Sequence, residues 1–286
     1  MATKLDISQL DFDGIKDNLK TFLSQQDEFT DYDFEGSGMN VLLDVLAYNT
    51  HYLGYNANML ANEMYLDSAD QRSSVVSLAK QVGYTSRSAV SSRATIDVVV
   101  NNASGASLTM ERGTKFTTTV RETNYSFIAN ADVSISPQDG VYKFSNLDVY
   151  EGTYLNYKYT ANTTDTDQRF IIPNNNVDTT TLTVTVQESS SDSTTNTYTL
   201  ASGVVGLDST SKVYFLQEVE NGRFEVYFGD GVIGQAIADG NIVILDYITC
   251  NRDEPNGASA FTLSGTVNGF SNVTITTIKT ASDGDA

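Results

Sequence analysis

The chain has 286 residues, of which 36 are acidic and 17 are basic, so its net charge is −19. Nucleic-acid binding needs a cationic surface that displaces counterions, and the sequence holds no cluster of Lys and Arg, so no nucleic-acid partner is expected. No run of about 18 consecutive apolar residues is present, so no membrane span is expected either. Cys250 is the only cysteine, which excludes an intrachain disulfide and suits assembly in a reducing cytoplasm.

Helical periodicity dominates the sequence as far as about residue 90. The first expected helix covers 13–25, with apolar residues spaced along one side at Phe12, Ile15, Leu19 and Phe22. A third helix is expected after a cap at Asp70 and ends at Gly83, with Val75, Leu78, Ala79 and Val82 facing inward.

Between these two lies the most informative segment, a helix of about 28 residues that follows an N-cap at Ser37 and runs to about Leu66. Two apolar series follow it in alternating steps of four and three residues, and they are displaced from each other by two residues. Two residues turn about 200° around a helix, so the series lie on nearly opposite sides. The first series supplies bundle-core candidates, namely Met39, Leu43, Leu46, Leu53, Leu60 and Met64. The second supplies partner-interface candidates, namely Val45, Tyr48, Tyr52, Tyr55 and Met59.

Two interpretations of the tyrosine series are open. The two short helices of the same chain could cover both series, which would make the tyrosines ordinary core residues. Alternatively, they cover one side only, and the tyrosine side binds helices of another subunit. Tyr and Met suit such a contact because each buries a large side chain, and Tyr keeps a polar tip. We favour the second interpretation.

From about residue 91 the pattern changes to short β-branched runs separated by Gly, Asn, Asp and Ser, which is typical of an antiparallel β structure. The segment 189–197 is rich in Ser and Thr and is expected to be a long hairpin loop. The fold class is therefore α+β: a helical bundle module over 1–90 with one long central helix, then an antiparallel β-rich module over 91–286 with a candidate division near 160–200. Strands are expected at 95–101, 114–119, 125–129, 141–150, 154–159, 170–172, 181–188, 213–218, 224–228, 241–247 and 273–279.

A glycine motif after one expected strand imitates a dinucleotide-binding fingerprint. Gly229, Gly231 and Gly234 match G-x-G-x-x-G, but only 235–240 separate the motif from the next expected strand, and no helix fits there to receive a pyrophosphate. The glycines instead indicate a turn with positive φ angles between the strands at 224–228 and 241–247. No cofactor is expected.

Nothing in the sequence indicates an enzyme or a metal site. His51 is the sole histidine, so a multi-histidine metal site is excluded, and no nucleophile motif accompanies it. Cys250 has no cluster of cations in the sequence around it to lower its pKa, which argues against a nucleophilic thiol.

Two parts of the sequence resemble a known family. The segments 33–37, 42–50 and 69–72 resemble the N-terminal part of the baseplate wedge subunit of T-even-like contractile-tailed phages, and 227–234 resembles the signature of the wider baseplate J-like family. The resemblance implies a non-enzymatic building block of the virion tail baseplate, assembled in the host bacterial cytoplasm. It also implies a homodimer within a hetero-oligomer, with N-terminal helices that join those of another wedge protein in a bundle.

Members of that family continue beyond the point that corresponds to Ala286, into a domain that links wedges into a ring. We therefore expect either that the sequence is a fragment or that a separate chain supplies the ring contact. The alternative function is a carbohydrate-binding or adhesive β-rich phage protein, because strands and loops rich in Thr, Ser and Asn also line fibres and lectins. The long helix with two apolar sides argues against that alternative.

Overall fold

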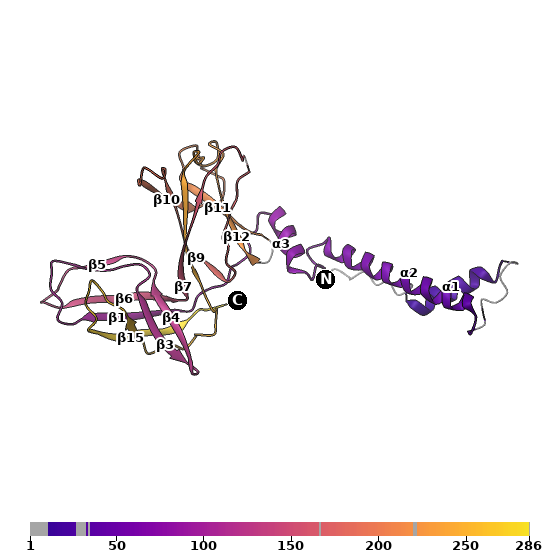
Figure 1. The fold of residues 1–286 in the computed structure, drawn as a ribbon, viewed down its shortest axis with the longest axis horizontal. Coiled ribbons are helices and arrows are strands. Elements are labelled where there is room, and N and C mark those ends of the chain that lie inside the picture. Colours follow the sequence, from indigo (N-terminus) through magenta and orange to yellow (C-terminus); the bar gives the residue numbers. More distant parts are fainter. Residues whose placement is uncertain (1–10, 27–32, 34, 166, 220–221, 286) are drawn as a thin grey trace. The chain divides into compact units, whose positions relative to one another are not determined.

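The computed structural model describes residues 11–26, 33, 35–165, 167–219 and 222–285 (Figure 1). The chain divides into two compact units, Met1–Thr85 and Ser86–Ala286. The first holds the helices and the second holds mostly antiparallel sheets, so the α+β expectation is confirmed. None of the helices in the described residues has the length and apolarity that a membrane span requires.

Local capping fixes where the helices begin. The helices are α1 (Phe12–Leu23), α2 (Gly38–Glu63) and α3 (Arg72–Gln81). The carboxylate of Asp11 accepts the backbone N–H of Gly14 at 2.6 Å, and the hydroxyl of Ser37 accepts the backbone N–H of Asn40 at 3.0 Å. These bonds satisfy N–H groups that the first turn of a helix leaves without a partner. The α3 cap is Gln71 rather than Asp70, and its side chain makes no capping bond.

Two residues on the predicted apolar sides of α1 and α3 are exposed. Phe22, in the last turn of α1, is 61% exposed, and Val82, at the end of α3, is 76% exposed. Periodicity assigns a residue to a side of a helix, but only a neighbouring element buries that side. In the described part of this unit, no element buries these two positions.

One sheet of the second unit is built from strands far apart in the sequence. It has six strands in the order β14-β3-β4-β6-β1-β15, accompanied by a two-stranded β2-β5 sheet. Their bounds are β1 (Arg93–Val100), β2 (Leu108–Met110), β3 (Lys115–Val120), β4 (Thr123–Ala129), β5 (Val133–Ile135), β6 (Tyr142–Glu151), β14 (Thr262–Ser264) and β15 (Val273–Ser282). Alternating inward residues of β1, such as Ile96 and Val98, pack with Phe116, Phe127 and Phe144 in a buried core.

The other sheet is built from the continuous stretch between β6 and β14. It has seven strands in the order β7-β13-β9-β10-β11-β12-β8. Their bounds are β7 (Thr153–Thr160), β8 (Phe170–Ile171), β9 (Val177–Gln187), β10 (Thr195–Leu200), β11 (Val213–Glu218), β12 (Phe224–Phe228) and β13 (Ile242–Thr249). Its core includes Phe170, Val184, Val226 and Leu245, all nearly inaccessible to solvent.

Three expectations about the strands need correction. The expected loop at 189–197 ends early, because β10 begins at Thr195 and pairs with β9. The pairing of β10 with β11 is parallel, whereas the other strand pairings among the described residues are antiparallel. The three-residue strands β2, β5 and β14 were not expected, because a run that short carries no periodicity of its own.

The glycine motif also differs from the expected turn. Strands β12 and β13 are not neighbours, so the segment between them is a longer connection and not a hairpin turn. Gly231 and Gly234 both have φ of +86°. Gly229 is not in this conformation; a Cβ atom on it would lie 2.3 Å from the carbonyl oxygen of Ile233. Glycine is therefore needed at Gly229 for a close approach of backbone to backbone.

Polar contacts connect the two sheets. The guanidinium of Arg112, which follows β2, donates to the hydroxyl of Thr183 and to the carbonyl of Thr181 on β9, both at 3.0 Å. It also lies 5.0 Å from the ring centroid of Tyr154 on β7. A planar guanidinium can make several such bonds at once, so Arg112 acts as a brace between the sheets.

Candidate protein-interaction site

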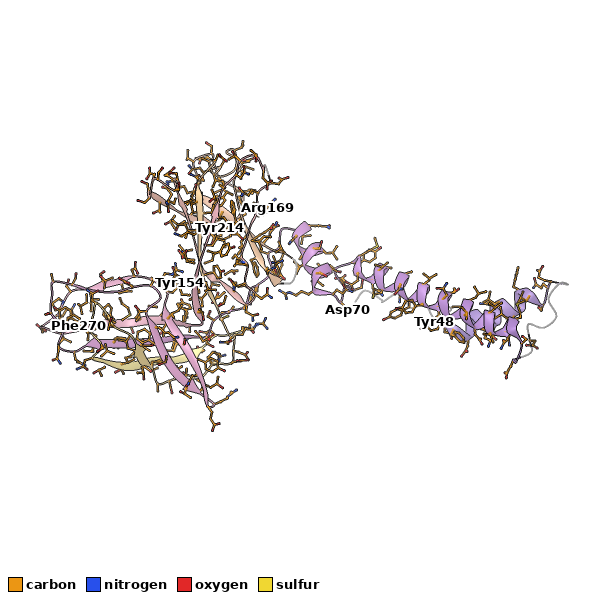
Figure 2. All side chains as sticks on the ribbon, viewed as in Figure 1. Tyr48, Asp70, Tyr154, Arg169, Tyr214 and Phe270 are labelled. Carbon is orange, nitrogen blue, oxygen red and sulfur yellow. The ribbon has the colours of Figure 1, made fainter. Side chains whose placement is uncertain are left out.

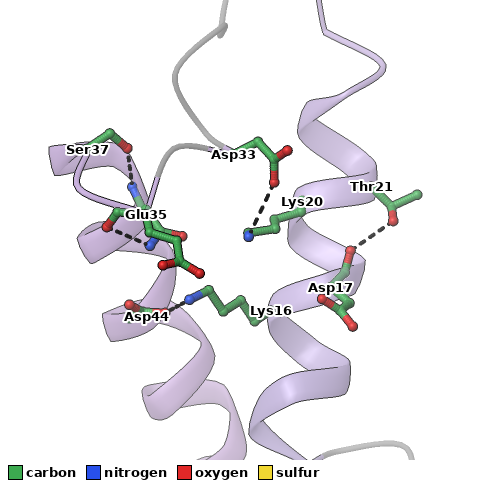
Figure 3. Close-up of polar contacts among 9 residues, drawn as sticks. Lys16, Asp17, Lys20, Thr21, Asp33, Glu35, Ser37 and Asp44 are labelled. Carbon is green, nitrogen blue, oxygen red and sulfur yellow. Dashed lines mark hydrogen bonds and ion pairs between the residues drawn. The ribbon is translucent and has the colours of Figure 1, made fainter.

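Helix α1 covers one side of the N-terminal part of α2. Ile15 of α1 is buried, as are Leu43 and Ala47 of α2. Ion pairs flank this contact: Lys16 to Asp44 at 2.5 Å and Lys20 to Asp33 at 3.4 Å (Figure 3). At 1.5 Å per residue, the 12 residues of α1 span about 18 Å and the 26 residues of α2 span about 39 Å. Helix α1 is therefore too short to cover α2.

Most of the apolar surface of α2 is exposed. We call Val45, Tyr48, Tyr52, Tyr55 and Met59 the tyrosine stripe and Leu46, Leu53 and Leu60 the leucine stripe. Tyr48 is 64% exposed and Leu60 is 63% exposed, and the other members of both stripes are also exposed. Fully burying one Leu or Val side chain stabilises a protein by about 1.5–3 kcal/mol. Large exposed apolar areas of this kind mark interaction sites.

Polar residues separate the two stripes on the exposed side. Asn49 and Asn56 are seven residues apart, about two turns of the helix, and their positions fall between the stripes. The only charged side chains on α2 are Asp44 and Glu63. Because amide side chains separate the two apolar stripes, the surface suits the binding of two partner helices better than the binding of one flat partner surface.

The tyrosine stripe is locally ordered. The rings of Tyr48 and Tyr52 are stacked, with centroids 6.4 Å apart and an angle of 19° between the ring planes. Figure 2 labels Tyr48, whose side chain projects away from the α2 ribbon. Stacked rings present a flat apolar surface with hydroxyl tips, and this composition is enriched at protein interfaces.

The last residue of α2, Glu63, binds the segment that leads into α3. The carboxylate of Glu63 accepts the backbone N–H groups of Asp70 and Gln71, at 3.0 and 3.2 Å. The side-chain hydrogen bond from Ser74, together with these backbone bonds, holds the pKa of Glu63 below its usual range. These contacts tie the end of α2 to the start of α3.

The candidate residues therefore lie as follows. Among the bundle-core candidates, Leu43 is buried, Met39 is half-buried, and Leu46, Leu53, Leu60 and Met64 are exposed; Met64 is the C-cap of α2. All five partner-interface candidates are exposed. Leu42 was not among the expected interface residues, but it is also exposed and belongs beside the leucine stripe. The sequence does contain a signal for Leu42, since it is an apolar residue that directly follows Val41.

The described residues contain no cluster of metal-binding side chains. No group of three or more His, Cys, Asp or Glu side chains is placed to hold a metal ion in this part of the chain. Cys250 is buried, and burial raises the pKa of its thiol, which makes it a poor nucleophile.

Two family models and one curated relative match this chain. Residues 11–84 match the family model "Baseplate wedge protein gp6-like, helical domain". Residues 157–256 match the model "Bacteriophage baseplate wedge protein gp6, third domain". The chain is 30% identical to baseplate wedge protein gp6 of Enterobacteria phage T4 over 287 aligned residues.

The chain belongs to the gp6-like family of phage baseplate wedge proteins. The alignment covers 93% of this chain and 42% of the T4 relative, so the chain spans less than half of that protein. The gp6-like helical domain contains α1, α2 and α3, and with them both exposed stripes. The gp6 third domain covers most of the seven-stranded sheet, including the glycine motif.

Proposed function

We propose that this chain is a non-enzymatic structural component of a phage tail baseplate wedge, and that α2 joins an inter-subunit helical bundle. The observation that supports this most directly is the exposure of both stripes of α2 beyond the reach of α1. Membership of the gp6-like family supports a baseplate role for such a helix. The partners are other baseplate wedge proteins, and the chain forms a homodimer within the hetero-oligomer.

The charge of the chain fits a controlled assembly. A net charge of −19 keeps separate copies apart and soluble, while α2 itself carries two acidic and no basic side chains. Association through α2 therefore buries apolar area without bringing many charges together. The complex belongs to the virion baseplate, and its assembly takes place in the host bacterial cytoplasm. Neither the fold nor the family match favours the carbohydrate-binding alternative.

The proposal is tested by co-expressing the chain with the other baseplate wedge proteins of the same phage. Wild type should co-purify as a heteromeric complex whose mass is measured by light scattering. Tyr52→Asp should weaken the complex at least about tenfold, because it inserts a charge into a contact that must lose its water. Tyr52 is 55% exposed in the isolated chain, so this change leaves the fold intact.

Asn49→Asp is the matched control. It adds the same charge to an exposed position of α2 between the stripes, so it should assemble like the wild type. Thermal unfolding of both variants reports on the β unit. Equal assembly of Tyr52→Asp, Asn49→Asp and wild type would contradict the assignment of the tyrosine stripe as an interface.

A further inference from the structure

A second exposed apolar surface lies at one end of the seven-stranded sheet. Its members are Leu200, Val204, Val205, Val232 and Ile233, which we call the apolar tip. Val205 is 97% exposed and Val232 is 71% exposed, and the other members are also exposed. The end of β10, the start of β11 and the end of β12 lie side by side there, because Leu200 and Phe228 both pair with Tyr214. The tip is thus carried by the β10–β11 loop and by the connection that follows β12.

The two loops are joined to each other by backbone hydrogen bonds. The N–H of Gly234 donates to the carbonyl of Asp208 at 3.1 Å, and the N–H of Gln235 donates to the carbonyl of Ser211 at 2.8 Å. These bonds fix the position of one half of the tip relative to the other.

Each loop is also closed on itself. The carboxylate of Asp230 accepts the N–H groups of Val232 and Ile233, both at 2.9 Å, and the N–H of Gly231 donates to the carbonyl of Gly234 at 3.1 Å. In the other loop, the carboxylate of Asp208 accepts from Thr210 and Ser211. Val232 and Ile233 are therefore held outward on a pre-organised turn, which lowers the entropy lost on binding.

The charges around the tip determine which partner fits. The two loops, 201–212 and 229–240, carry Asp208, Asp230 and Asp239 against Lys212, whose ammonium group donates to Asn196 at 2.6 Å. Backbone hydrogen bonds from Ile233 and Val232 hold the pKa of Asp230 below its usual range, and the side-chain hydrogen bonds from Thr210 and Ser211 do the same for Asp208, so both carboxylates are charged at neutral pH. A second copy of this chain would bring like charges together, which costs several kcal/mol at an interface.

We propose that the apolar tip inserts into an apolar recess bordered by Lys or Arg on a different polypeptide of the baseplate. Val205, Val232 and Ile233 fill the recess, and the basic rim faces Asp208 and Asp230. The contact is separate from the one proposed for α2. A tip of this size contributes as a second attachment point, because a chain already bound elsewhere presents it at high effective concentration. The inference rests on the proposed function, because that function is the reason to look for the partner in the baseplate.

The test uses the full chain, with a photo-crosslinking amino acid at position 232, produced during infection so that it enters tails. Position 191 is the control, because Ser191 is an exposed residue of the β9–β10 loop of the same sheet. Crosslinked peptides from purified baseplates are identified by mass spectrometry. We expect position 232, and not position 191, to crosslink to another polypeptide at apolar residues flanked by Lys or Arg.

Three results would overturn the inference: crosslinks from position 232 to a second copy, crosslinks to a peptide without basic residues, or no crosslink above the level of position 191. If any of these three results is obtained with the chain present in the baseplates, the proposal for α2 still stands. Absence of the chain from the baseplates would overturn both.

A second experiment measures how much the apolar tip contributes to incorporation of the chain into baseplates. Val232→Asp should lower incorporation into baseplates at least about fivefold, the effect of losing about 1 kcal/mol at an interface. Ser191→Asp adds the same charge on the same sheet and should incorporate normally. Equal incorporation of the two variants would overturn the inference, provided that their unfolding temperatures match the wild type.

Discussion

The carboxylate of Glu151 accepts two hydrogen bonds from Asn251, one from the backbone N–H at 2.8 Å and one from the side-chain amide at 2.7 Å. Glu151 ends β6 of the six-stranded sheet, and Asn251 follows β13 of the seven-stranded sheet. Glu151 is 1% exposed, so this pair joins the two sheets through a buried acid. Burial raises the pKa of Glu151, although the bonds from Asn251 oppose the effect.

Replacing Glu151 with Gln should change how stability depends on pH. A carboxyl group whose pKa is raised in the folded state contributes stability that is complete below the ordinary value of 4.5 and is lost as pH rises through the raised value. Relative to wild type, Glu151→Gln should therefore gain stability as pH rises above the ordinary value of 4.5, with a slope of at most about 1.4 kcal/mol per pH unit, until the pH passes the raised pKa of Glu151. Urea unfolding at several pH values measures the difference. The exposed Glu111→Gln serves as control, and a difference between Glu151→Gln and wild type that is constant with pH would contradict the prediction.

Replacing Gly152 with Ala should destabilise the β unit by more than about 3 kcal/mol, because it adds an atom where there is no space. Gly152 joins β6 to β7 with φ of +135°, and a Cβ atom on it would lie 2.2 Å from the carbonyl oxygen of Thr249. Gly140 also has positive φ, +79°, but a Cβ atom there meets nothing within 4 Å. Gly140→Ala should thus cost only about 1 kcal/mol. Thermal unfolding compares the two, and equal losses would show that backbone conformation alone matters at Gly152.

Replacing Arg112 with Lys keeps the charge but removes the planar fork. The variant cannot reproduce the bonds to Thr183, Thr181 and Asn130 together with the contact on Tyr154. We expect a loss of about 1–3 kcal/mol in the free energy of unfolding. Arg121→Lys, at an exposed turn, should be neutral. If both substitutions were neutral, the guanidinium would have no role as a brace.

Replacing Ser37 with Ala removes the cap of α2, because the N–H of Asn40 loses the hydroxyl it donates to. The helix should lose about 1 kcal/mol of local stability, and Ser37→Asp should restore it. Hydrogen exchange of the first turns of α2 in the full chain is the appropriate measurement. Exchange should be faster in Ser37→Ala and close to wild type in Ser37→Asp; no change in either would rule out a capping role.

The helices could be located from the sequence because their determinants are local. Ser37 caps α2 as expected, and Gly83 has the positive φ of +76° that suits the residue after a helix. What periodicity cannot supply is the partner for each apolar side. On spacing alone, Val82 was assigned inward and Phe22 was assigned to the apolar side of α1, and in the described structure both are exposed.

The sheets show the same limit. Strands with clear alternation, such as β1 and β13, were located closely, whereas β10 was missed because its Thr and Asn residues look like a loop. Strand order and the parallel pairing of β10 with β11 depend on contacts far apart in the sequence. The apolar tip went unnoticed for a related reason: Val204 and Val205 stand out only once the loop around them is known to be exposed.

The order of strands dictates an order of events during synthesis. All strands of the seven-stranded sheet come from one uninterrupted stretch, β7 to β13, so that sheet can form as soon as this stretch leaves the ribosome. The six-stranded sheet cannot, because β1 waits for β15, and Arg93 pairs with Ser282 across nearly the whole unit. Until then one side of β1 has unpaired backbone groups, which can attract other nascent chains. Within the β unit, the sheet whose first strand is made earliest is therefore completed last.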